Sequence, residues 1–579
     1  MSGRMAAGST VLRAVLAAAV LWLVLIQPNH PHALGWGALR MFPLELPVIL
    51  LGLVALPGRA LLTTVLRALL VAVLMVLVVA KLADFATFVA YGRAFNLLAD
   101  APLIHAAWML GSGSIGVLPA SAAVLGGLLA LGLLGWALWW ATGVWAHLHL
   151  SRWRVPAALA LVPAAVLAVG EIGQAMRAWS LPAAPPGSAF TARVAVERTL
   201  FYRAALRDYE EFRREAAADV FAAAPPQRVL DLIGDVDVLI MYVESYGRSS
   251  FLNPLYSGTH PATLAAIEER LADRGLAMRS AFLTAPMRGG QSWLAHGSIA
   301  TGLWIDNQRR NAAMLASPRR TLFHFAQGSG FDTAAVMPAI TMDWPEGGFF
   351  GFDTILAATE LGYAGEPFNW VTMPDQFTLK SMDRKLRQGR PGVDRPPLFA
   401  QVALISSHAP WTPVPELIDW DAITDGTEFN EMARAGDPPE VVWRDHDRVR
   451  EQFRLAVDYA LQVVGSYAER HADEPPLMIV LGDHEPAPFV AGVDSYDVPI
   501  HLIGPAHLVE RAAEWGWEPG LLPSPDAPVW RMDRFRDRFL ALFSTAQPQA
   551  GAVTASRALA EGEGTGALAG APQFREVQR

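Results

Sequence analysis

The first third of the chain alternates long apolar runs with short polar connections. Five runs before residue 180 are apolar enough to be interpreted as membrane spans. They are Val11 to Ile26, Phe42 to Leu56, Leu61 to Ala80, Val117 to Trp145 and Val155 to Val169. A hydrocarbon core of roughly 30 Å needs about 20 helical residues, so the first, second and fifth runs cross it only if flanking residues extend them. The pattern predicts an α-helical membrane domain of about five spans.

The arginines between these runs indicate an orientation. Arg4 and Arg13 precede the first run, Arg59 follows the second, and Arg152 and Arg154 lie between the fourth and fifth. Basic residues concentrate in cytoplasmic segments, so these three segments are expected in the cytoplasm. An odd number of spans then places everything after residue 180 on the other side. We therefore expect a multi-pass protein of a bacterial inner or plasma membrane, with an extracytoplasmic catalytic domain, periplasmic or extracellular.

Two features complicate this interpretation. The first run also fits a cleaved signal peptide, because arginines precede an apolar stretch, but four further spans make cleavage unnecessary. Arg67 and Lys81 lie at the ends of the third run, where snorkelling side chains or a shifted register would accommodate them.

From about Leu230 the pattern changes to short apolar runs separated by helical stretches. Buried strands that alternate with helices predict an α/β domain with a mostly parallel sheet covered by helices on both faces. The expected strands are Val236 to Val243, Met278 to Leu283, Thr333 to Met337, Leu398 to Ile405, Leu477 to Leu481 and Val498 to Ile503. Sites in such folds collect at the carboxyl ends of the strands. Glu244, His408, Asp483 and His484 all follow predicted strands there.

The sequence divides into four predicted regions. Residues 1–180 form the transmembrane domain, 181–229 an amphipathic linker, 230–545 the extracytoplasmic catalytic domain and 546–579 a disordered tail. Thr191 to Ala223 has charged and aromatic residues at helical spacing, which fits a helix on the membrane and equally a surface helix of the catalytic domain. The tail is rich in Ala, Gly, Glu and Thr without periodicity.

Composition supports a membrane part joined to a globular part. The 579 residues are 52% hydrophobic, with a mean hydropathy of +0.26. The first 180 residues hold 10 Lys and Arg against 4 Asp and Glu, so the total charge of −9 leaves −15 for the rest. An acidic domain gains no long-range steering of anions, and nucleic acid is not an expected partner. The absence of Cys excludes disulfides, thiolate metal sites and cysteine nucleophiles.

Glu244, Asp483 and His484 form a candidate metal site. A divalent cation that activates a phosphate ester prefers oxygen ligands with an imidazole, in a geometry open to substrate. Adjacent Asp and His both ligate only where the chain leaves regular structure, and Gly482 and Pro486 bracket such a turn. A turn with a helix-capping Asp is the alternative interpretation.

Ser292 is the candidate nucleophile. It follows Gly289 and Gly290 and precedes an expected helix, where a Ser is either a helix cap or a nucleophile beside the positive helix end. Ser298 and Thr301 lie within or after that helix, where packing or backbone hydrogen bonds are expected. His296 shares a face with Ser292 at helical spacing, and we interpret it as structural.

His408 lies in the segment Ser-Ser-His-Ala-Pro-Trp after a strand. It is a candidate proton donor to the leaving oxygen or a clamp on the phosphate, and a structural histidine is the alternative.

These segments carry a resemblance. Val-Glu-Ser-Tyr-Gly, Gly-Gly-Gln-Ser, Ser-His-Ala-Pro-Trp and Leu-Gly-Asp-His, behind membrane spans, resemble the lipoteichoic acid synthase group of the alkaline phosphatase/sulfatase superfamily, with the lipid A phosphoethanolamine transferases as cousins. The resemblance implies one divalent cation, manganese or zinc, with magnesium a further candidate. It also implies a phosphoglycerol or phosphoethanolamine head group that moves from a membrane phospholipid, through a covalent phospho-enzyme, to a hydroxyl of an envelope glycan, glycolipid or polymer.

The resemblance also implies roles for residues. The metal ligands would be Glu244, Ser292, Asp483 and His484, with Ser292 as nucleophile and His408 as a catalytic substrate contact. The implied head-group pocket contains Asp343, Trp344 and Glu346, together with Arg288. Glu346 stands where these relatives have an Arg, which would favour a cationic group such as ethanolamine. Formylglycine sulfatase chemistry is disfavoured, because Ser292 is followed by Trp-Leu-Ala rather than by the x-Pro-x-Arg motif.

Two rival functions stay open. A membrane-anchored hydrolase would pass the phosphoryl or sulfuryl group to water. A non-catalytic relative would bind envelope glycans or act as a scaffold, although the presence of all four metal-site residues argues against it.

Overall fold

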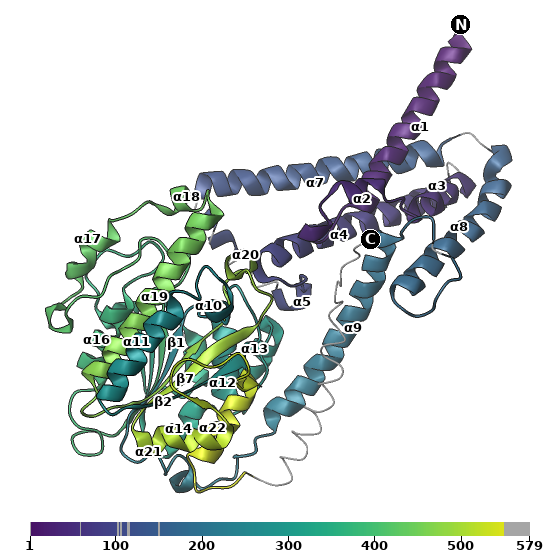
Figure 1. Cartoon of the computed structure of the whole chain (residues 1–579). Coiled ribbons are helices and arrows are strands. Elements are labelled where there is room, and N and C mark those ends of the chain that lie inside the picture. Colours follow the sequence, from purple (N-terminus) through teal and green to yellow (C-terminus); the bar gives the residue numbers. More distant parts are fainter. Residues whose placement is uncertain are drawn as a thin grey trace. The chain divides into compact units, whose positions relative to one another are not determined.

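The computed structural model describes residues 2–57, 60–100, 104, 107–109, 111–112, 116–148, 151–183 and 185–548. Arg59 and most of the predicted tail, residues 549–579, lie outside this set. The chain forms two compact units, Met1–Asp208 and Tyr209–Arg579 (Figure 1).

The first unit is helical. Its long helices are α1 (Ser2–Ile26), α4 (Leu61–Tyr91), α7 (Val117–Ala146) and α8 (Arg154–Ala175), with α3 (Glu45–Ala55) between the first two. Shorter helices are α2 (Trp36–Arg40) and α5 (Leu97–Asp100), and α9 (Phe190–Ala217) leads into the second unit. Among the described residues, 4 helices are long and apolar enough to cross a membrane.

The second predicted span is therefore wrong as a full span. Its helix α3 has 11 residues, and at 1.5 Å per residue it reaches only about 16 Å. Proline explains the limit, because Pro57 disfavours helical backbone at Leu56 directly before it. The first and fifth runs gain the flanking residues that they need, since α1 has 25 residues and α8 has 22.

One end of the bundle gathers the start of α9, the end of α1 and the start of α3. The ammonium of Lys81 in α4 donates to Thr191 Oγ1 at 2.6 Å and to the Leu25 carbonyl at 3.4 Å. Glu45 at the start of α3 accepts a hydrogen bond from the Ala192 backbone N–H at 2.9 Å. We call this the α9 end of the bundle.

The opposite end joins the start of α4 and the end of α7 to the middle of α1. Arg67 in α4 donates to the Trp139 carbonyl at 2.7 Å. The indole N–H of Trp145 donates to the Ala14 carbonyl in α1 at 3.1 Å. Helix α3 begins at the α9 end, and a short turn after it leads to the start of α4 at the opposite end. Helix α3 and this turn together therefore return the chain from the α9 end to the opposite end, although α3 is short.

With α3 counted, the chain therefore still runs from one end of the bundle to the other an odd number of times. Helices α1, α4 and α8 run toward the α9 end, whereas α3 and α7 run away from it. Glu171 near the end of α8 accepts from Ser188 Oγ at 2.9 Å, just before α9, which fixes the direction of α8. Helix α9 thus starts at the end of the bundle opposite to the start of α1.

The second unit contains one sheet of nine strands in the order β4-β3-β5-β1-β6-β7-β2-β8, with β9 also paired to β2. The six predicted strands are all present, as β1 (Val238–Val243), β2 (Ala277–Thr284), β3 (Asp332–Met337), β5 (Leu398–Leu404), β6 (Leu477–Gly482) and β7 (Asp497–Gly504). Short strands β4 (Thr354–Ala357), β8 (Glu518–Pro519) and β9 (Val529–Arg531) were not predicted. Neighbouring strands from β4 to β6 are parallel, whereas β7 is antiparallel to both β6 and β2. The predicted mostly parallel α/β fold is confirmed.

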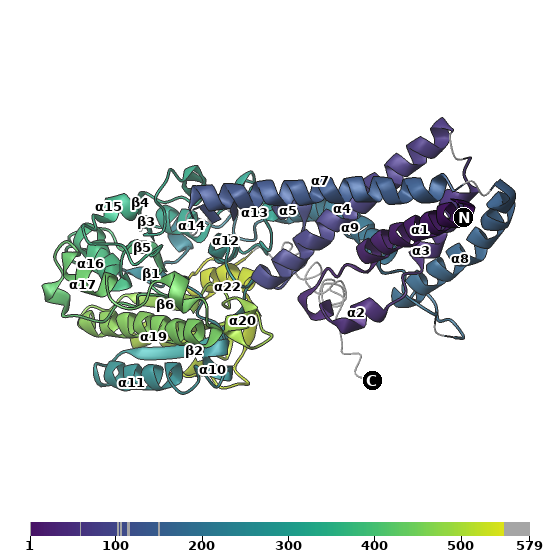
Figure 2. The same cartoon turned by 90° about the horizontal axis from the view of Figure 1, so that it is seen from above.

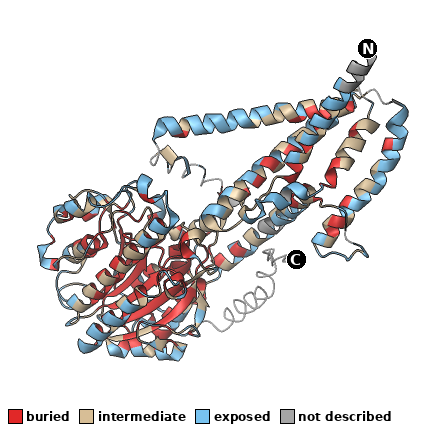
Figure 3. Cartoon of the chain, turned by 45° about the horizontal axis from the view of Figure 1, so that its top comes forward, coloured by how far each residue is buried: buried red, intermediate tan, exposed pale blue. Residues whose placement is uncertain are grey.

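Successive residues of β1 enter the cores on opposite faces of the sheet, as a pleated strand requires. Leu239, Met241 and Val243 pack in one core, whereas Ile240 and Tyr242 pack in the other. The buried residues concentrate in the strands and the helix faces against them (Figure 3).

Helices cover both faces. The first face packs against α11 (His260–Asp273), α16 (Asp375–Leu386) and α19 (His446–Arg470), and the second against α12 (Ser292–Thr301), α13 (Gln308–Leu315), α14 (Leu322–Gly328) and α22 (Phe535–Leu542). Short helices are α10 (Ser249–Leu252), α15 (Ala358–Leu361), α17 (Asn430–Ala433), α18 (Pro439–Val442), α20 (Pro488–Ala491) and α21 (Ala506–Val509). Helices α11 and α19 lie side by side (Figure 2), where Thr263 donates to Asp458 at 2.5 Å.

The amino edge of the sheet has its own polar cluster. Asp237, directly before β1, is 1% exposed and accepts from Arg395 at 2.6 Å and from Arg387 at 2.9 Å. Its other oxygen accepts from the Leu398 backbone N–H at 2.8 Å. This carboxylate therefore ties the starts of β1 and β5 together.

Candidate active site at the carboxyl edge of the sheet

Four polar residues from distant parts of the chain meet at one edge of the sheet. Strands β1 and β6 are parallel neighbours, so Glu244 after β1 and the pair Asp483 and His484 after β6 emerge side by side. Strand β2 runs in the same direction as β6, because β7 between them is antiparallel to both. The loop after β2 consequently brings Ser292 to the same edge.

The hydroxyl of Ser292 lies among the other three side chains. Ser292 Oγ is 3.0 Å from Glu244 Oε2 and 3.3 Å from His484 Nε2. His484 Nε2 lies 3.3 Å from Glu244 Oε1 and 3.8 Å from Asp483 Oδ2. One ligand atom from each of Glu244, Asp483 and His484 fits within 4.8 Å of the others, which suits a shared cation.

Backbone groups hold the two residues after β6 in place. Asp483 Oδ1 accepts from the backbone N–H groups of Ser245 at 2.8 Å and His484 at 2.7 Å, which leaves Oδ2 for a ligand. His484 Nδ1 lies 2.9 Å from the Glu485 carbonyl, which only accepts hydrogen bonds. Nδ1 therefore carries a proton, and Nε2 faces Ser292 and Glu244.

The charges of this cluster are strongly coupled. Burial works to raise the pKa of Glu244, but the charge and hydrogen bond of His484 outweigh it and hold that pKa well below its usual value. Burial and then the charge of Glu244 raise the pKa of Asp483 to about 7. Burial opposes the charged form of His484, yet the two carboxylates raise its pKa to about 10.

The cluster fits a divalent cation. Two buried carboxylates this close repel each other unless a positive charge lies between them, and a proton on His484 supplies that charge here. A cation held by Glu244, Asp483, His484 and the Ser292 oxygen would replace that proton.

The segment before α12 has an unusual backbone. Gly289 and Gly290 have φ of 77° and 129°, and Gln291 has φ of 70°, in the left-handed region that residues with a Cβ rarely adopt. Gln291 occupies the N-cap position, so Ser292 is the first residue of the helix. Ser292 is thus not the cap, and its hydroxyl faces Glu244 and His484 at the positive end of α12.

His408 lies at the same edge, after β5. It is half-buried, and its Nδ1 lies 2.6 Å from the Ala409 carbonyl. The neighbouring Ser407 hydroxyl donates to the Glu244 carbonyl at 2.7 Å and ties this segment to the end of β1.

The implied head-group residues follow β3, two strands along the sheet from β1. Asp343 and Glu346 are exposed in the segment after β3. Trp344 is half-buried and packs on Phe350 and Phe352, with ring centroids 5.9 Å and 6.2 Å apart. Their role in binding a head group therefore stays a prediction.

Arg288 is engaged within the second unit. Its guanidinium donates to Asp494 at 2.8 Å and lies 4.9 Å from the ring centroid of Tyr496. Its role in substrate binding stays a prediction.

Sequence reasoning missed the supporting residues Ser245, Ser407 and Gln291. Ser245 and Ser407 each follow a predicted strand end within three residues, which was the available signal. His296 packs on Tyr242 with ring centroids 3.9 Å apart, and burial lowers its pKa to about 3. His296 is consequently neutral and lies beneath the cluster.

Comparisons with known proteins give likeness of structure only. No family model matches the chain, and no curated protein matches it by sequence. The lipoteichoic acid synthase LtaP from Listeria monocytogenes is 12% identical with a TM-score of 0.33, over 51% of this chain and 70% of that one. The Streptococcus pyogenes phosphoglycerol transferase GacH, in complex with sn-glycerol-1-phosphate, is 12% identical with a TM-score of 0.36, over 58% and 80%.

The C-terminal periplasmic domain of EcEptC from Escherichia coli is 12% identical with a TM-score of 0.34, over 54% of this chain and 83% of that one. At such low identities and TM-scores, the functional argument rests on the chain's own residues.

Proposed function

We propose that the chain is a membrane-tethered, metal-dependent transferase that moves a phosphoalcohol head group through a phospho-Ser292 intermediate. The observation that carries this proposal is the position of the Ser292 hydroxyl, within 3.3 Å of both a carboxylate and an imidazole at the sheet edge. A hydroxyl placed between a base and a cation site, at the start of a helix, is arranged for attack on an anionic phosphoryl group.

In the first step Ser292 Oγ attacks the phosphorus of a phospholipid head group. The Ser292 hydroxyl gives its proton to Glu244 Oε2, which lies 3.0 Å away, as the new Oγ–P bond forms. The bond from phosphorus to the diacylglycerol oxygen breaks, and His408 supplies the proton that this oxygen takes up. In the second step an acceptor hydroxyl gives its proton to His408 and attacks phosphorus, the Oγ–P bond breaks, and Ser292 takes back the proton from Glu244.

The cation supports both steps. When bound, it lowers the pKa of the Ser292 hydroxyl and offsets negative charge on the phosphoryl oxygens. Glu244, Asp483 and His484 hold their positions through the sheet, so the site needs little rearrangement to receive it. Manganese and zinc are the proposed ions, with magnesium as the further candidate.

Location favours a lipid donor. Helix α9 leaves the bundle at the end opposite to the start of α1, so a cytoplasmic start of α1 puts the catalytic unit outside the cytoplasm. A catalytic unit tethered to a bilayer meets phospholipid head groups at high effective concentration. The proposed donors are phosphatidylglycerol and phosphatidylethanolamine, and the proposed acceptor is an envelope glycan, glycolipid or polymer.

The test uses the full chain in detergent with each donor labelled in its head group. Release of diacylglycerol with the label retained on Ser292, followed by passage to an acceptor, supports transfer. The Ser292→Ala variant should retain no label, whereas a Ser257→Ala control should match the wild type, because Ser257 lies in a turn between α10 and α11.

Other results identify the rivals. Free glycerophosphate or phosphoethanolamine with no adduct on Ser292 would indicate a hydrolase. No turnover of any donor and no bound divalent ion would indicate a binding or scaffold protein.

A further inference from the structure

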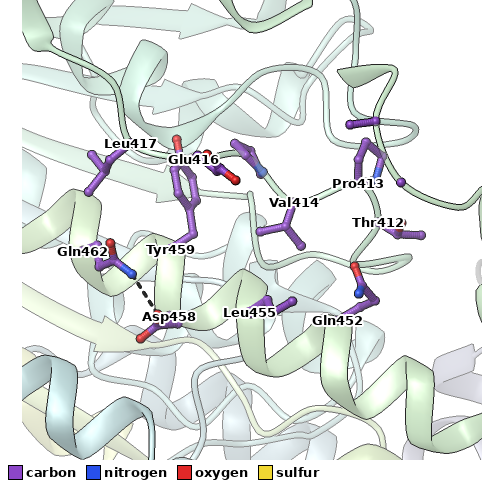
Figure 4. Close-up of a pocket in the computed structure, with 13 residues that line it drawn as sticks. Thr412, Pro413, Val414, Glu416, Leu417, Gln452, Leu455, Asp458, Tyr459 and Gln462 are labelled. Carbon is purple, nitrogen blue, oxygen red and sulfur yellow. Dashed lines mark hydrogen bonds between the residues drawn. The ribbon is translucent and has the colours of Figure 1, made fainter. Parts of the chain in front are cut away.

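A cavity next to the His408 segment has no role in the chemistry described above. Its volume is about 550 Å³, within the roughly 300–1,000 Å³ that is usual for ligand pockets. One wall is the segment Thr412–Leu417, and the facing wall is the middle of α19 (Figure 4).

The cavity is close to the catalytic residues along the chain. Its first wall residue, Thr412, follows His408 by four positions, so their Cα atoms lie at most about 14 Å apart. A ligand in the cavity that extends by a sugar unit or two therefore reaches the catalytic edge.

The charge of the lining excludes anionic ligands. Glu416 and Asp458 contribute carboxylates, and none of the described lining residues is a Lys, Arg or His. An anionic phosphate or carboxylate placed there would meet like charge without a compensating cation.

The remaining polar groups suit hydroxyls. Gln452 and Gln462 present amides that both donate and accept hydrogen bonds. Asp458 is oriented by Gln462 at 2.7 Å and by Thr263 at 2.5 Å, which fixes its carboxylate at the wall (Figure 4).

Tyr459 adds a buried hydroxyl that can still donate a hydrogen bond. It is 4% exposed, and the backbone N–H of Gln376 faces its oxygen. The ring rises from α19 toward Glu416 (Figure 4). Within the described part of the chain no acceptor takes the hydroxyl hydrogen, which favours a polar ligand or water beside it. Apolar surface from Val414 and Leu455 completes a lining that is mixed rather than lipid-like.

We propose that this cavity binds an uncharged, hydroxyl-rich sugar unit of the acceptor while a hydroxyl of the same acceptor reaches the phosphoryl group on Ser292. This inference rests on the proposed transferase function, and it narrows the acceptor from any envelope polymer to a glycan whose bound unit is not anionic.

The first experiment measures binding without turnover. The full-length Ser292→Ala protein in detergent is tested against an array of neutral, amine-bearing and phosphate-bearing oligosaccharides. We expect neutral members to bind, and Ala435→Trp to weaken that binding at least 10-fold, because Ala435 is an exposed lining residue where a large ring fills the cavity. Glu514→Trp, at an exposed position away from the cavity, is the matched control. Binding of phosphate-bearing or amine-bearing members alone, no binding, or binding that ignores Ala435→Trp would each overturn the proposal.

The second experiment separates this inference from the function that it rests on. With Ser292 intact, Ala435→Trp should form the phospho-Ser292 adduct at the wild-type rate but transfer it to a neutral oligosaccharide at least 10-fold more slowly. Unchanged transfer would refute the cavity proposal while the transferase function stands. Absence of the adduct in the wild type would instead refute the transferase function, and the binding array would still decide the cavity.

Discussion

The hydroxyl of Ser292 and Nε2 of His484 lie 3.3 Å apart although 192 positions separate them in the chain. The sheet order produces this meeting, since β2 and β6 run in the same direction on either side of β7. The pair forms the centre of the proposed chemistry and gives the first prediction.

Removal of the Ser292 hydroxyl should abolish turnover. We expect Ser292→Ala to lower head-group release by about three orders of magnitude or more, because the attacking oxygen is lost. Ser292→Thr, which retains the hydroxyl, should keep measurable activity. Diacylglycerol release from labelled phospholipid measures both. Ser292→Ala turnover within 10-fold of wild type would contradict the assignment.

Metal removal should destabilise the second unit. A cation present at about 100 times its Kd stabilises a folded protein by about 2.7 kcal/mol. A shift of about 4 °C in Tm is then expected for a domain of this size between chelated and metal-loaded protein. Glu244→Gln should remove this difference, whereas Glu360→Gln, at an exposed position, should preserve it. Metal content by mass spectrometry and thermal unfolding provide the readouts, and a metal-loaded Glu244→Gln protein with the full shift would refute the ligand role.

Asp237 should matter for stability and not for chemistry. Replacement by Asn takes the carboxylate from Arg395 and leaves Arg387 with Asp383 at 3.1 Å, which costs up to about 3–5 kcal/mol, the range for a broken buried pair. The exposed Asp235→Asn two positions earlier is the matched control. Urea unfolding at pH 7 measures the difference.

The pH dependence of this effect has a definite sign. Burial raises the pKa of Asp237, but Arg395 and Arg387 together outweigh it and hold the pKa below its usual value of 3.8. A lowered pKa gives stability that is present above the unfolded value and is lost as the pH falls through the folded value. The difference between wild type and Asp237→Asn should therefore stay constant from pH 8 to about 5 and shrink below about pH 4. A constant difference down to pH 3 would contradict this origin.

His501 should make the second unit sensitive to mild acid. It lies in β7 between Ser280 Oγ at 2.7 Å and Tyr246 Oη at 3.2 Å, and burial lowers its pKa to about 3. The unfolded chain takes up a proton near pH 6.5 while the folded chain does not, so stability falls as the pH drops below that value. The loss from this group reaches up to about 3 kcal/mol at pH 4.

Replacing His501 should flatten that dependence. His501→Gln is expected to be less stable at pH 7 but to lose less stability between pH 6.5 and 4.5, whereas the exposed His507→Gln should follow the wild type. Urea midpoints across this range measure the slope. Equal slopes in wild type and His501→Gln would contradict the assignment.

The orientation of the chain is testable because the sequence contains no Cys. Single cysteines at the exposed positions Asp526, in the second unit, and His147, at the end of α7, should label differently. In intact cells or spheroplasts, an impermeant maleimide should label Asp526→Cys and should label His147→Cys only after lysis. The reverse pattern would place the catalytic unit in the cytoplasm and exclude an outer-leaflet donor.

Sequence pattern predicted six of the nine strands, because each of these six is a short and mostly apolar run. It also predicted that Glu244, Asp483 and His484 lie at one edge of the sheet, since residues that follow parallel strands share an edge. It did not predict that β7 runs antiparallel to its neighbours. An apolar run does not indicate whether its strand is parallel or antiparallel to the neighbouring strands. His501 inside β7 shows that such a run can also include a buried polar group.

Local patterns failed where the outcome depends on distant contacts. The second apolar run is as long as the fifth, yet proline limits its helix to Glu45–Ala55. Spacing also did not indicate that Trp344 packs on Phe350 and Phe352, and its role in head-group binding stays a prediction. The cavity beside Thr412 combines a loop with the middle of α19, and no local spacing indicates that pairing.

The residues that stabilise the sheet and the residues proposed for catalysis lie at opposite edges of it. The arginines that clamp Asp237 secure the rim where β1 and β5 begin, while Ser292 and its neighbours occupy the rim where strands end. A protein engineer can therefore seek heat tolerance around Asp237 without disturbing turnover. Mutations selected for a new acceptor can likewise be confined to the edge that carries Ser292, so that the contacts of Asp237 are unchanged.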